Sequence, residues 1–515
     1  MDAIQRSKKV SERTARPDGA AMIGARTGAP DVREQVFAIP VGVDRFLVYA
    51  PLKRLAFVAN GAMAGAIGRE LAIRAAGSTP SGERLDRTSA GHACGAPGDP
   101  PEKPATPPAH DSENPTPGPK TPGPATPDES GPLAFLRRLD FFRPEPPPSN
   151  ATWMDPPVYD TCVLFLTNRC NLRCVYCYAE AGDRPERRMS WPIARAALDR
   201  VAAEARLQPA RRMTLAFHGG GEPTLNWPVL ERAVRHAEDA ARREGLHLQV
   251  CGAFNGYWSP ARLDFIRTHF TELSLSVDGL PELQDRQRPT RGGRPSAGVG
   301  ERTLRSFDAA GFSYGLRLTV TAEGAGRLHE SVAYLCEHFR PHTIQVEPVF
   351  AEGRGAALPP AAADPAVFID RFIRSDAIAA SAGVRLFYSG ARPDSLTARF
   401  CLAPLRALVV TPEGCVTTCF EVFGPDHPQS DTFIVGRYDG RGGFEFRPER
   451  LRARLDETVE GAESCRGCFC RWHCAGDCRA RPGRARASPP PSVPTASPSP
   501  RAGGTPRSSC GTPKA

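Results

Sequence analysis

The chain has 515 residues, of which 40% are apolar and 24% are charged, so it is long enough for more than one domain and can bury a substantial core. No apolar run reaches the ~18 residues that a membrane-spanning helix needs, and the basic N-terminus is not followed by the apolar stretch of a secretory signal. These features argue against a membrane protein and an exported protein, and we expect a cytoplasmic location.

Prolines and positive charges are unevenly distributed. Residues 91–150 contain 17 of the 53 prolines, and residues 479–515 contain nine, together with seven basic residues and no acidic one. Segments of this composition bury too little apolar surface to offset the entropy of ordering. We predict a disordered N-terminus over 1–34, a proline-rich disordered linker over 91–150 and a disordered proline- and arginine-rich tail over 481–515. Because the tail holds most of the net charge of +9, we expect neither a nucleic-acid nor a membrane partner.

A small module is expected before the linker, over residues 35–90. Apolar runs at 36–40, 44–50 and 54–60 predict three short strands, and residues 61–77 predict a helix. The sequence thus predicts a β-rich α+β module.

The middle of the chain alternates between short apolar runs and helix-length segments. The runs predict strands at 161–167, 212–218, 246–254, 273–277, 313–320 and 343–349. The segments between them predict helices at 191–205, 227–243, 260–269, 300–310 and 328–339. Such alternation indicates repeated βα units, and six units favour an α/β fold built as a partial (β/α)6 barrel that resembles a TIM barrel. Functional residues then belong at the C-terminal ends of the strands, where cysteines, glycines, Asn255 and Asp278 occur.

Sixteen cysteines in a long chain without a secretory signal favour metal binding or redox chemistry over disulfides. Eleven of them form three groups: Cys170, Cys174 and Cys177; Cys401, Cys415 and Cys419; and Cys465, Cys468, Cys470, Cys474 and Cys478.

The first group follows the first strand of the predicted barrel, in the segment TNRCNLRCVYCYAEAG. This Cys170-x3-Cys174-x2-Cys177 segment resembles the radical S-adenosylmethionine (radical SAM) superfamily. The resemblance implies a [4Fe–4S] cluster with three thiolate ligands and one open iron that chelates S-adenosylmethionine. It further implies that the reduced cluster cleaves this ligand to a 5′-deoxyadenosyl radical, which removes a hydrogen atom from the substrate. A zinc loop with a fourth ligand elsewhere is the alternative.

Further residues match positions that bind S-adenosylmethionine in that superfamily, and we place its core at 151–390. Tyr176 matches the aromatic residue near the adenine. In HGGGEPTLNW, Gly220, Gly221 and Glu222 match the motif that meets the methionine amino group. Glycine runs more often form simple turns, so this motif depends on its context.

Two polar residues later in the core extend this assignment. Ser276 in SLSVDG matches a serine that contacts the ribose or the methionine part of the ligand, and Arg288 in QDRQRP matches the arginine that pairs with the methionine carboxylate. A strand-end hydroxyl and a surface arginine are the alternative readings of these two positions.

The later cysteines resemble the SPASM extension of radical SAM enzymes, which we place at 391–480 as a loop-rich domain. The pattern is C-x12-G-x4-C followed by C-x2-C-x5-C-x3-C. The resemblance implies two auxiliary [4Fe–4S] clusters, and a zinc ribbon is the alternative for Cys465 and Cys468. The first cluster takes Cys401, Cys419 and Cys478, with Cys415 as a plausible fourth ligand. The second takes Cys465, Cys468 and Cys474.

The last cysteine of the SPASM pattern has no clear counterpart here. Only Cys510, in the proline-rich tail, follows Cys478. Three alternatives stay open: the tail folds back and supplies Cys510, Cys470 substitutes for the missing ligand, or the second cluster keeps an open iron.

The residue after Cys419 bears on the substrate. Anaerobic sulfatase-maturating enzymes, which make formylglycine on a partner protein, carry an aspartate there, whereas this chain has Phe420 followed by Glu421. Glu421 is the candidate catalytic base, although a side chain two residues on points differently in a strand. This difference lowers the sulfatase-type reading without excluding it.

The combined resemblance implies a radical SAM/SPASM maturase that oxidatively modifies a ribosomally made peptide. Its partners would be a peptide or protein substrate and an electron donor such as flavodoxin or ferredoxin. The N-terminal module would hold the leader of the peptide by strand addition, or would only cap the barrel. The alternatives are a sulfatase-maturating type of enzyme and a non-catalytic zinc-binding protein.

Overall fold

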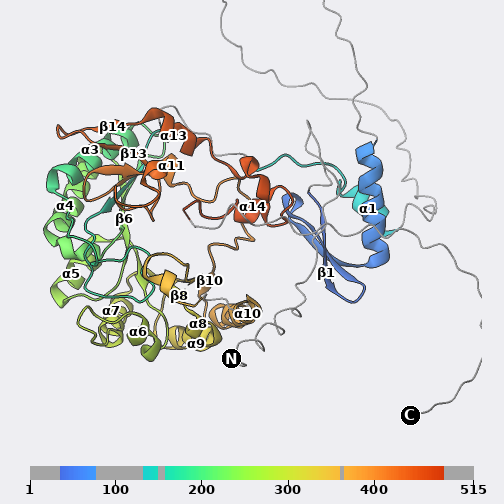
Figure 1. Cartoon of the computed structure of the whole chain (residues 1–515), viewed down its shortest axis with the longest axis horizontal. Coiled ribbons are helices and arrows are strands. Elements are labelled where there is room, and N and C mark those ends of the chain that lie inside the picture. Colours follow the sequence, from blue (N-terminus) through green and yellow to red (C-terminus); the bar gives the residue numbers. More distant parts are fainter. Residues whose placement is uncertain (1–34, 77–130, 149–156, 360–364, 481–515) are drawn as a thin grey trace, which may run out of the picture. The chain divides into compact units, whose positions relative to one another are not determined.

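The computed structural model describes residues 35–76, 131–148, 157–359 and 365–480 (Figure 1). These residues form two compact units, one within 1–146 and one within 147–489. The predictions of disorder for 1–34, 91–130 and 481–515 lie outside the described residues, as does Cys510. No helix in the described ranges is long and apolar enough to cross a membrane.

The first unit contains a three-stranded antiparallel sheet followed by a helix. Its elements are β1 (Phe37–Gly42), β2 (Arg45–Ala50), a 3-10 turn η2 (Pro51–Lys53), β3 (Leu55–Asn60) and α1 (Gly61–Ala76). These elements confirm the three strands and the helix expected from the sequence. Asp44, in the β1–β2 turn, ties the turn to α1 by accepting a hydrogen bond from the Gly61 backbone N at 2.8 Å.

Residues 131–146 belong to this first unit, so the prediction of a disordered linker is wrong for them. Helix α2 (Pro132–Arg138) and the residues after it bury Leu136, Phe141 and Phe142 in the same core as Val48 and Leu71. Aromatic side chains of this size bury enough surface to order a short segment. The proline content of the surrounding 60 residues concealed this apolar stretch.

The second unit is built on an 11-stranded sheet. Its first eight strands are all parallel neighbours. In sheet order these are β10 (Arg385–Phe387), β9 (Thr343–Pro348), β8 (Tyr314–Val320), β7 (Leu273–Ser276), β6 (His247–Phe254), β5 (Arg212–His218), β4 (Thr161–Phe165) and β11 (Ala407–Val410). The antiparallel strands β12 (Cys415–Thr417), β13 (Ile434–Tyr438) and β14 (Phe444–Phe446) follow.

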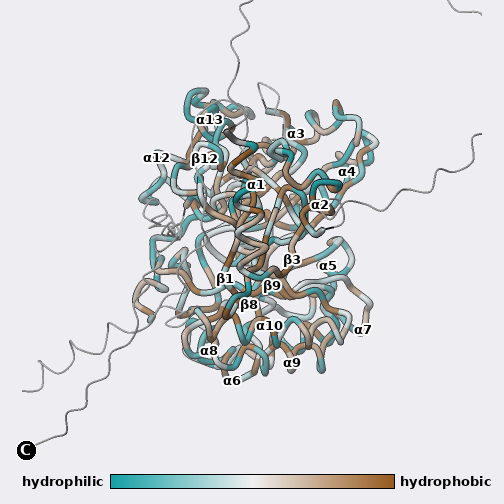
Figure 2. Tube along the Cα trace, turned by 90° about the vertical axis from the view of Figure 1, so that its right-hand side faces the viewer, coloured by the Kyte–Doolittle hydropathy of each residue, from teal (hydrophilic) through white to brown (hydrophobic). Residues whose placement is uncertain are grey.

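Helices cover the outside of the parallel strands (Figure 1). The long ones are α3 (Trp191–Arg206), α4 (Trp227–Glu244), α5 (Pro260–His269), α7 (Ala297–Ala310), α9 (Leu328–His338) and α10 (Pro365–Ser381). The short helices of this unit, which do not all belong to that outer layer, are η3 (Pro223–Asn226), α6 (Pro281–Gln287), α8 (Ala322–Gly326), η4 (Gly353–Ala357), α11 (Ala403–Arg406), α12 (Ser430–Phe433), α13 (Pro448–Leu455), η5 (Val459–Gly461), η6 (Glu463–Cys465) and α14 (Arg471–Cys474). The peripheral helix α4 is largely hydrophilic along its trace (Figure 2).

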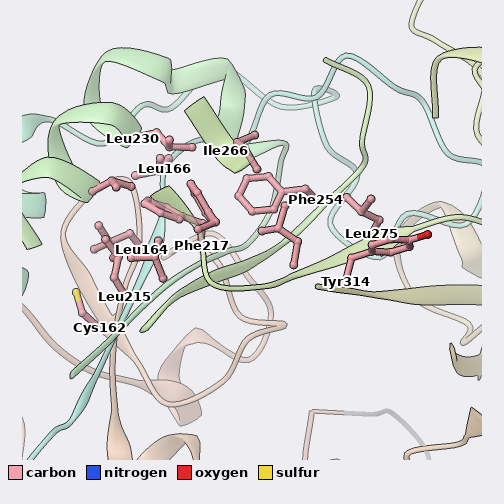
Figure 3. Close-up of a cluster of buried hydrophobic side chains, with 14 of the residues drawn as sticks. Cys162, Leu164, Leu166, Leu215, Phe217, Leu230, Phe254, Ile266, Leu275 and Tyr314 are labelled. Atoms are coloured by element: carbon pink, nitrogen blue, oxygen red, sulfur yellow. The ribbon is translucent and has the colours of Figure 1, made fainter. Parts of the chain in front are cut away.

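The main core lies between the strands and these helices. Alternate residues of β4 and β5, among them Cys162, Leu164, Leu215 and Phe217, pack with helix residues such as Leu230 (Figure 3). Since side chains alternate across a strand, the residues between them face the other side of the sheet, where the candidate site lies.

The six predicted strands correspond to β4–β9, and the predicted α/β class is confirmed. The sequence missed β10 and β11, which extend the parallel sheet at its two ends, and the three antiparallel strands after them. Strand β11, which precedes most of the loop-rich C-terminal region, pairs directly with β4.

Candidate active site in the barrel cavity

A cavity of about 470 Å³ opens at the C-terminal ends of the parallel strands. One part of its wall is the first cysteine group, and another part is the C-terminal cysteine region. The cysteines that line it are Cys170, Cys174, Cys177, Cys401, Cys419 and Cys478. Two motifs more than 200 residues apart in the sequence thus face one cavity.

The first cysteine group sits on a loop after β4 that a later segment of the chain holds in place. Arg354, in η4, donates from Nε to the Cys174 carbonyl at 2.8 Å and from its backbone N to the Cys177 carbonyl at 3.1 Å. Its Nη1 also pairs with Asp183 Oδ2 at 2.6 Å. These contacts satisfy two backbone carbonyls of the loop and join it to η4.

The thiols of this loop have specific polar neighbours. Asn255 Nδ2 lies 3.7 Å from the Cys170 Sγ, and Arg288 Nη1 lies 3.8 Å from the Cys174 Sγ. Burial raises the pKa of Cys174 to about 11 and that of Cys170 well above its usual range. The free thiols therefore keep their protons at neutral pH, and binding of a metal cluster must displace them.

The glycine segment after β5 packs directly on this loop. A Cβ at Gly221 would lie 2.3 Å from the Arg169 carbonyl oxygen, so only glycine fits there. The next residue, Glu222, donates its backbone N to the same carbonyl at 2.8 Å. Gly220 also lines the cavity, and a Cβ there would be 3.0 Å from the Phe423 ring.

The Glu222 carboxylate is buried and hydrogen-bonded within the protein. Its Oε1 accepts from the Thr224 hydroxyl at 2.7 Å and from Trp258 Nε1 at 3.3 Å, while Oε2 accepts from the Asn255 backbone N at 2.9 Å. Burial raises the pKa of this carboxyl above its usual range. Since each carboxylate oxygen has two acceptor positions, Oε2 retains capacity for one more donor.

Tyr176 and Arg288 form a buried network with Asp278. The Tyr176 hydroxyl donates to Asp278 Oδ2, and Arg288 Nε lies 3.2 Å from Asp278 Oδ1. The Arg288 guanidinium also lies over the Tyr176 ring, 5.4 Å from its centroid. Ser276, at the end of β7, lines the cavity with them. Arg288 is thus a buried, paired arginine that faces the cluster loop and not a surface arginine.

These residues fit a [4Fe–4S] cluster with S-adenosylmethionine. Thiols are the usual ligands of iron–sulfur clusters, and the three of the first group line one cavity beside a glycine cradle, a carboxylate and a guanidinium. The individual ligand roles of Tyr176, Gly220, Gly221, Glu222, Ser276 and Arg288 stay predictions.

The structure brings together part of the second cysteine group. The charges that act on the buried Cys419 thiol include those of Glu421, Cys478 and Cys401, after the larger effect of burial, which raises its pKa. Cys415 packs against the same small cluster of residues, but the charged groups that act on it are Glu413, Arg447 and Arg437. Its role as a fourth ligand stays a prediction.

The third group forms a compact turn around α14. The Cys470 thiol lies within hydrogen-bonding reach of the Cys468 thiol, which lowers the pKa of Cys468. The Cys474 thiol lies near Cys468 and Cys465, and its backbone N donates to the Cys470 carbonyl at 2.7 Å. Cys470, one of the two cysteines considered for the missing position, therefore lies beside the others of this group. The second, Cys510, lies outside the described residues.

Glu421 lines the cavity next to a predicted cluster ligand. Its Oε2 lies 3.7 Å from the Cys478 Sγ, and its backbone N lies 3.4 Å from the Cys419 Sγ. The neighbouring Phe420 ring instead packs on His218, with centroids 5.2 Å apart. Glu421 thus reaches the cavity although it lies two residues after Cys419.

The sequence placed Asn255 and Asp278 at the ends of predicted strands, where functional residues are expected, but their hydrogen-bond partners could not be inferred. Two further candidates could not be predicted. Arg354 and Arg317 carry no motif, and only the fold brings them to the cavity or to the cysteine loop.

Two curated proteins are similar to part of this chain. An uncharacterized protein of Methanocaldococcus jannaschii is 28% identical over 174 residues, which cover 34% of this chain and 57% of that protein. The Fe-coproporphyrin III synthase of Methanosarcina barkeri is 26% identical over 196 residues, covering 38% of this chain and 45% of the synthase. The chain thus spans about half the length of the curated relatives it matches.

Two solved structures that are similar to part of this chain contain S-adenosylmethionine. Native anSMEcpe with bound AdoMet has a TM-score of 0.48 and 18% identity, covering 65% of this chain and 92% of that chain. SuiB of Streptococcus suis bound to S-adenosylmethionine has a TM-score of 0.43 and 14% identity, covering 67% and 76% of the two chains.

The family model that matches the chain covers the cysteine loop, the glycine segment and the network of Asp278 and Arg288. It is the model of the radical SAM superfamily, and it matches residues 164–321. This protein therefore carries a radical SAM domain.

Proposed function

We propose that the protein is a radical SAM/SPASM maturase that oxidatively modifies residues of a ribosomally synthesised peptide, for example by forming a crosslink. The observation that carries the proposal is the single cavity into which Cys170, Cys174 and Cys177 face together with Cys401, Cys419 and Cys478. One set of thiols would hold the cluster that binds S-adenosylmethionine. The other would hold a cluster close enough to accept an electron from the modified substrate.

The protein's contribution to the chemistry would be to hold and orient these groups. When bound, the cluster and S-adenosylmethionine supply a 5′-deoxyadenosyl radical that abstracts a hydrogen atom. Arg354 fixes the cysteine loop through the Cys174 carbonyl. Glu222 Oε2 and the Arg288 guanidinium offer an acceptor and a donor for the amino and carboxylate groups of the methionine part.

Two auxiliary [4Fe–4S] clusters would occupy the C-terminal region. The first would take Cys401, Cys419 and Cys478, with Cys415 as the candidate fourth ligand. The second would take Cys465, Cys468 and Cys474, and the position of Cys470 beside Cys468 supports it as the remaining ligand. Flavodoxin or ferredoxin is the class of electron donor that such an enzyme would need.

The substrate would be a peptide. The three-stranded sheet of the first unit has edge strands at β1 and β3, to which an extended leader segment could add as a further strand.

The test is anaerobic reconstitution of the full chain with iron and sulfide. We expect a brown protein that, after reduction, converts S-adenosylmethionine into 5′-deoxyadenosine. Cys174→Ala should abolish this conversion, and Cys336→Ala is the matched control because that thiol lies on helix α9, away from the cavity lining. Zinc without iron in the purified protein, or cleavage that survives in Cys174→Ala, would contradict the proposal.

The second candidate is a sulfatase-maturating type of enzyme, which makes formylglycine on a partner protein. The position of Glu421 in the cavity supports it, since a base is required within reach of the substrate. Co-expression with candidate peptides or sulfatases from neighbouring genes separates the two. Loss of two hydrogens from a short peptide supports the peptide maturase, whereas a formylglycine in a sulfatase supports the alternative.

A further inference from the structure

Arg317 occupies the inner face of the parallel sheet. On β8 it is in register with Ser276 of β7 and Gln345 of β9, and all three side chains line the cavity. Its neighbours Leu316 and Leu318 are buried in the core on the opposite face. The strand alternation therefore directs the guanidinium into the space between the two cysteine regions.

The Arg317 guanidinium has neither a hydrogen bond nor an ion pair within the described part of the chain. The other arginines near the first cysteine group differ in this respect. Arg288 pairs with Asp278 and Arg354 pairs with Asp183. A guanidinium that faces a cavity without an ion pair has its donors available to an anionic ligand.

In the described part of the chain, no hydrogen bond or ion pair joins Arg317 to a carboxylate that lines the cavity. Glu347 of β9 accepts from Gln345 Nε2 at 2.7 Å and from the Ser389 backbone N at 3.1 Å. Glu421, on the other side of the cavity, contacts the Cys478 thiol. The positive charge of Arg317 thus remains available to a ligand.

The charge of Arg317 affects the pKa values of two side chains in this region, His218 and Tyr178. Burial first, and then the Arg317 charge, lower the pKa of His218 to about 4, so His218 is neutral at pH 7. Its Nδ1 has no hydrogen-bond partner among the described residues. The charge of Arg317 also acts on the Tyr178 phenol, whose pKa burial raises. The cation and a neutral imidazole therefore share one region of the cavity.

We propose that Arg317 is an anion subsite that binds a carboxylate of the peptide substrate. The planar guanidinium matches a carboxylate in a two-point hydrogen bond, which gives orientation as well as affinity. The carboxylate would come from an Asp or Glu side chain or from the C-terminus of the peptide. The identity of the substrate as a peptide rests on the proposed function, whereas the carboxylate preference rests on Arg317 itself.

The test uses the full chain with its clusters reconstituted and S-adenosylmethionine bound, and three small probes. These are N-acetyl-glutamate N-methylamide for a side-chain carboxylate, N-acetyl-glycine for a C-terminal carboxylate, and the neutral N-acetyl-glutamine N-methylamide. Binding is measured by calorimetry for the wild type, Arg317→Gln, Arg317→Lys and Arg302→Gln. Arg302 is an exposed arginine on α7, so its variant controls for loss of one positive charge.

We expect one of the two carboxylate probes to bind the wild type more tightly than the neutral probe does. Arg317→Gln should weaken that binding by about 10- to 100-fold, the usual effect of losing a charge-assisted hydrogen bond. Arg317→Lys should recover part of it, and Arg302→Gln should not change it. The probe that binds tells whether a side chain or a C-terminus supplies the carboxylate.

Two results would overturn the subsite. One is equal binding of the carboxylate and neutral probes to the wild type. The other is an Arg317→Gln variant that loses affinity for S-adenosylmethionine but not for the carboxylate probes, because Arg317 would then belong to the cofactor site. A wild type that prefers carboxylate probes but never forms 5′-deoxyadenosine would leave the subsite intact and contradict only the proposed function.

Discussion

The close approach of the glycine segment to the cysteine loop explains why residue 221 is a glycine. Its Cβ position is filled by the backbone of Arg169, not by a flexible side chain. A larger residue must therefore push apart the two segments that carry Cys170 and Glu222. The sequence identified the glycines as cofactor contacts, but it could not show that Gly221 is also required by the packing of the protein itself.

We predict that Gly221→Ala lowers the free energy of unfolding by about 1–3 kcal/mol, the usual cost of overpacking, and weakens S-adenosylmethionine binding. Denaturant titration and calorimetry measure the two effects. Gly292→Ala is the matched control, because no heavy atom lies within 4 Å of its Cβ position. Equal stability of the two variants would show that the loops are not packed as described.

His218 makes stability depend on pH. Its pKa is about 4 in the folded chain, mainly because of burial, against about 6.5 in an unfolded chain. Between these values the unfolded chain binds more protons than the folded one, so stability falls as the pH falls from about 6.5 towards 4. The contribution is at most about 3 kcal/mol across this range.

We expect His218→Gln to flatten this part of the pH profile. The measurement is the free energy of unfolding at pH 7 and at pH 5 for both proteins. His247→Gln is the matched control, because that histidine is exposed at the start of β6. A wild type and a His218→Gln variant that lose the same stability between the two pH values would contradict the burial of His218.

Strands and helices could be predicted from the sequence where the apolar residues follow a clear strand or helix pattern. The six strands β4–β9 are apolar runs bounded by polar residues, and the long helices between them show helical spacing. β10 has three residues, too few for a period. Helix α10 exposes Ile369 and Ile373, at 55% and 64%, which disturbs its apolar pattern. β11 lies among the cysteines and was assigned to a loop-rich domain.

The pairing of β11 with β4 shows that the predicted boundary at residues 390 and 391 cuts a continuous sheet. The two strands match over four residue pairs, and Arg406 forms an ion pair with Asp160 at the start of β4. Removing β11 would leave the apolar strand β4 as an unpaired edge of the parallel sheet.

We therefore predict that a chain ending at residue 390 aggregates or unfolds without cooperativity, whereas a chain ending at residue 480 unfolds cooperatively. Size-exclusion chromatography and denaturant titration of the two truncated proteins test this. A monomeric, cooperative 1–390 protein would mean that the cysteine region is an independent domain.

At the scale of the whole molecule, the candidate site depends on segments that the sequence could not bring together. The spacing of Cys170, Cys174 and Cys177 identified the cofactor, because those residues share one short loop. The cavity also needs Arg317 from β8 and Cys401, Cys419 and Cys478 from the C-terminal region, while Arg354 of η4 holds the cysteine loop. The parallel order of the strands explains why the cysteine loop, the glycine segment and Ser276 meet at one end of the sheet. It does not predict the C-terminal cysteines, which lie outside the parallel strands.

The central claim is that three thiols of one loop hold a cluster whose remaining iron binds S-adenosylmethionine. The most direct measurement is electron–nuclear double resonance on the reduced protein with S-adenosylmethionine labelled with ¹⁵N at its amino group and ¹⁷O at its carboxylate. We predict hyperfine coupling of both labels to the cluster in the wild type. A reduced cluster whose spectrum is unchanged by the labelled ligand, because a fourth side chain already occupies that iron, would contradict it.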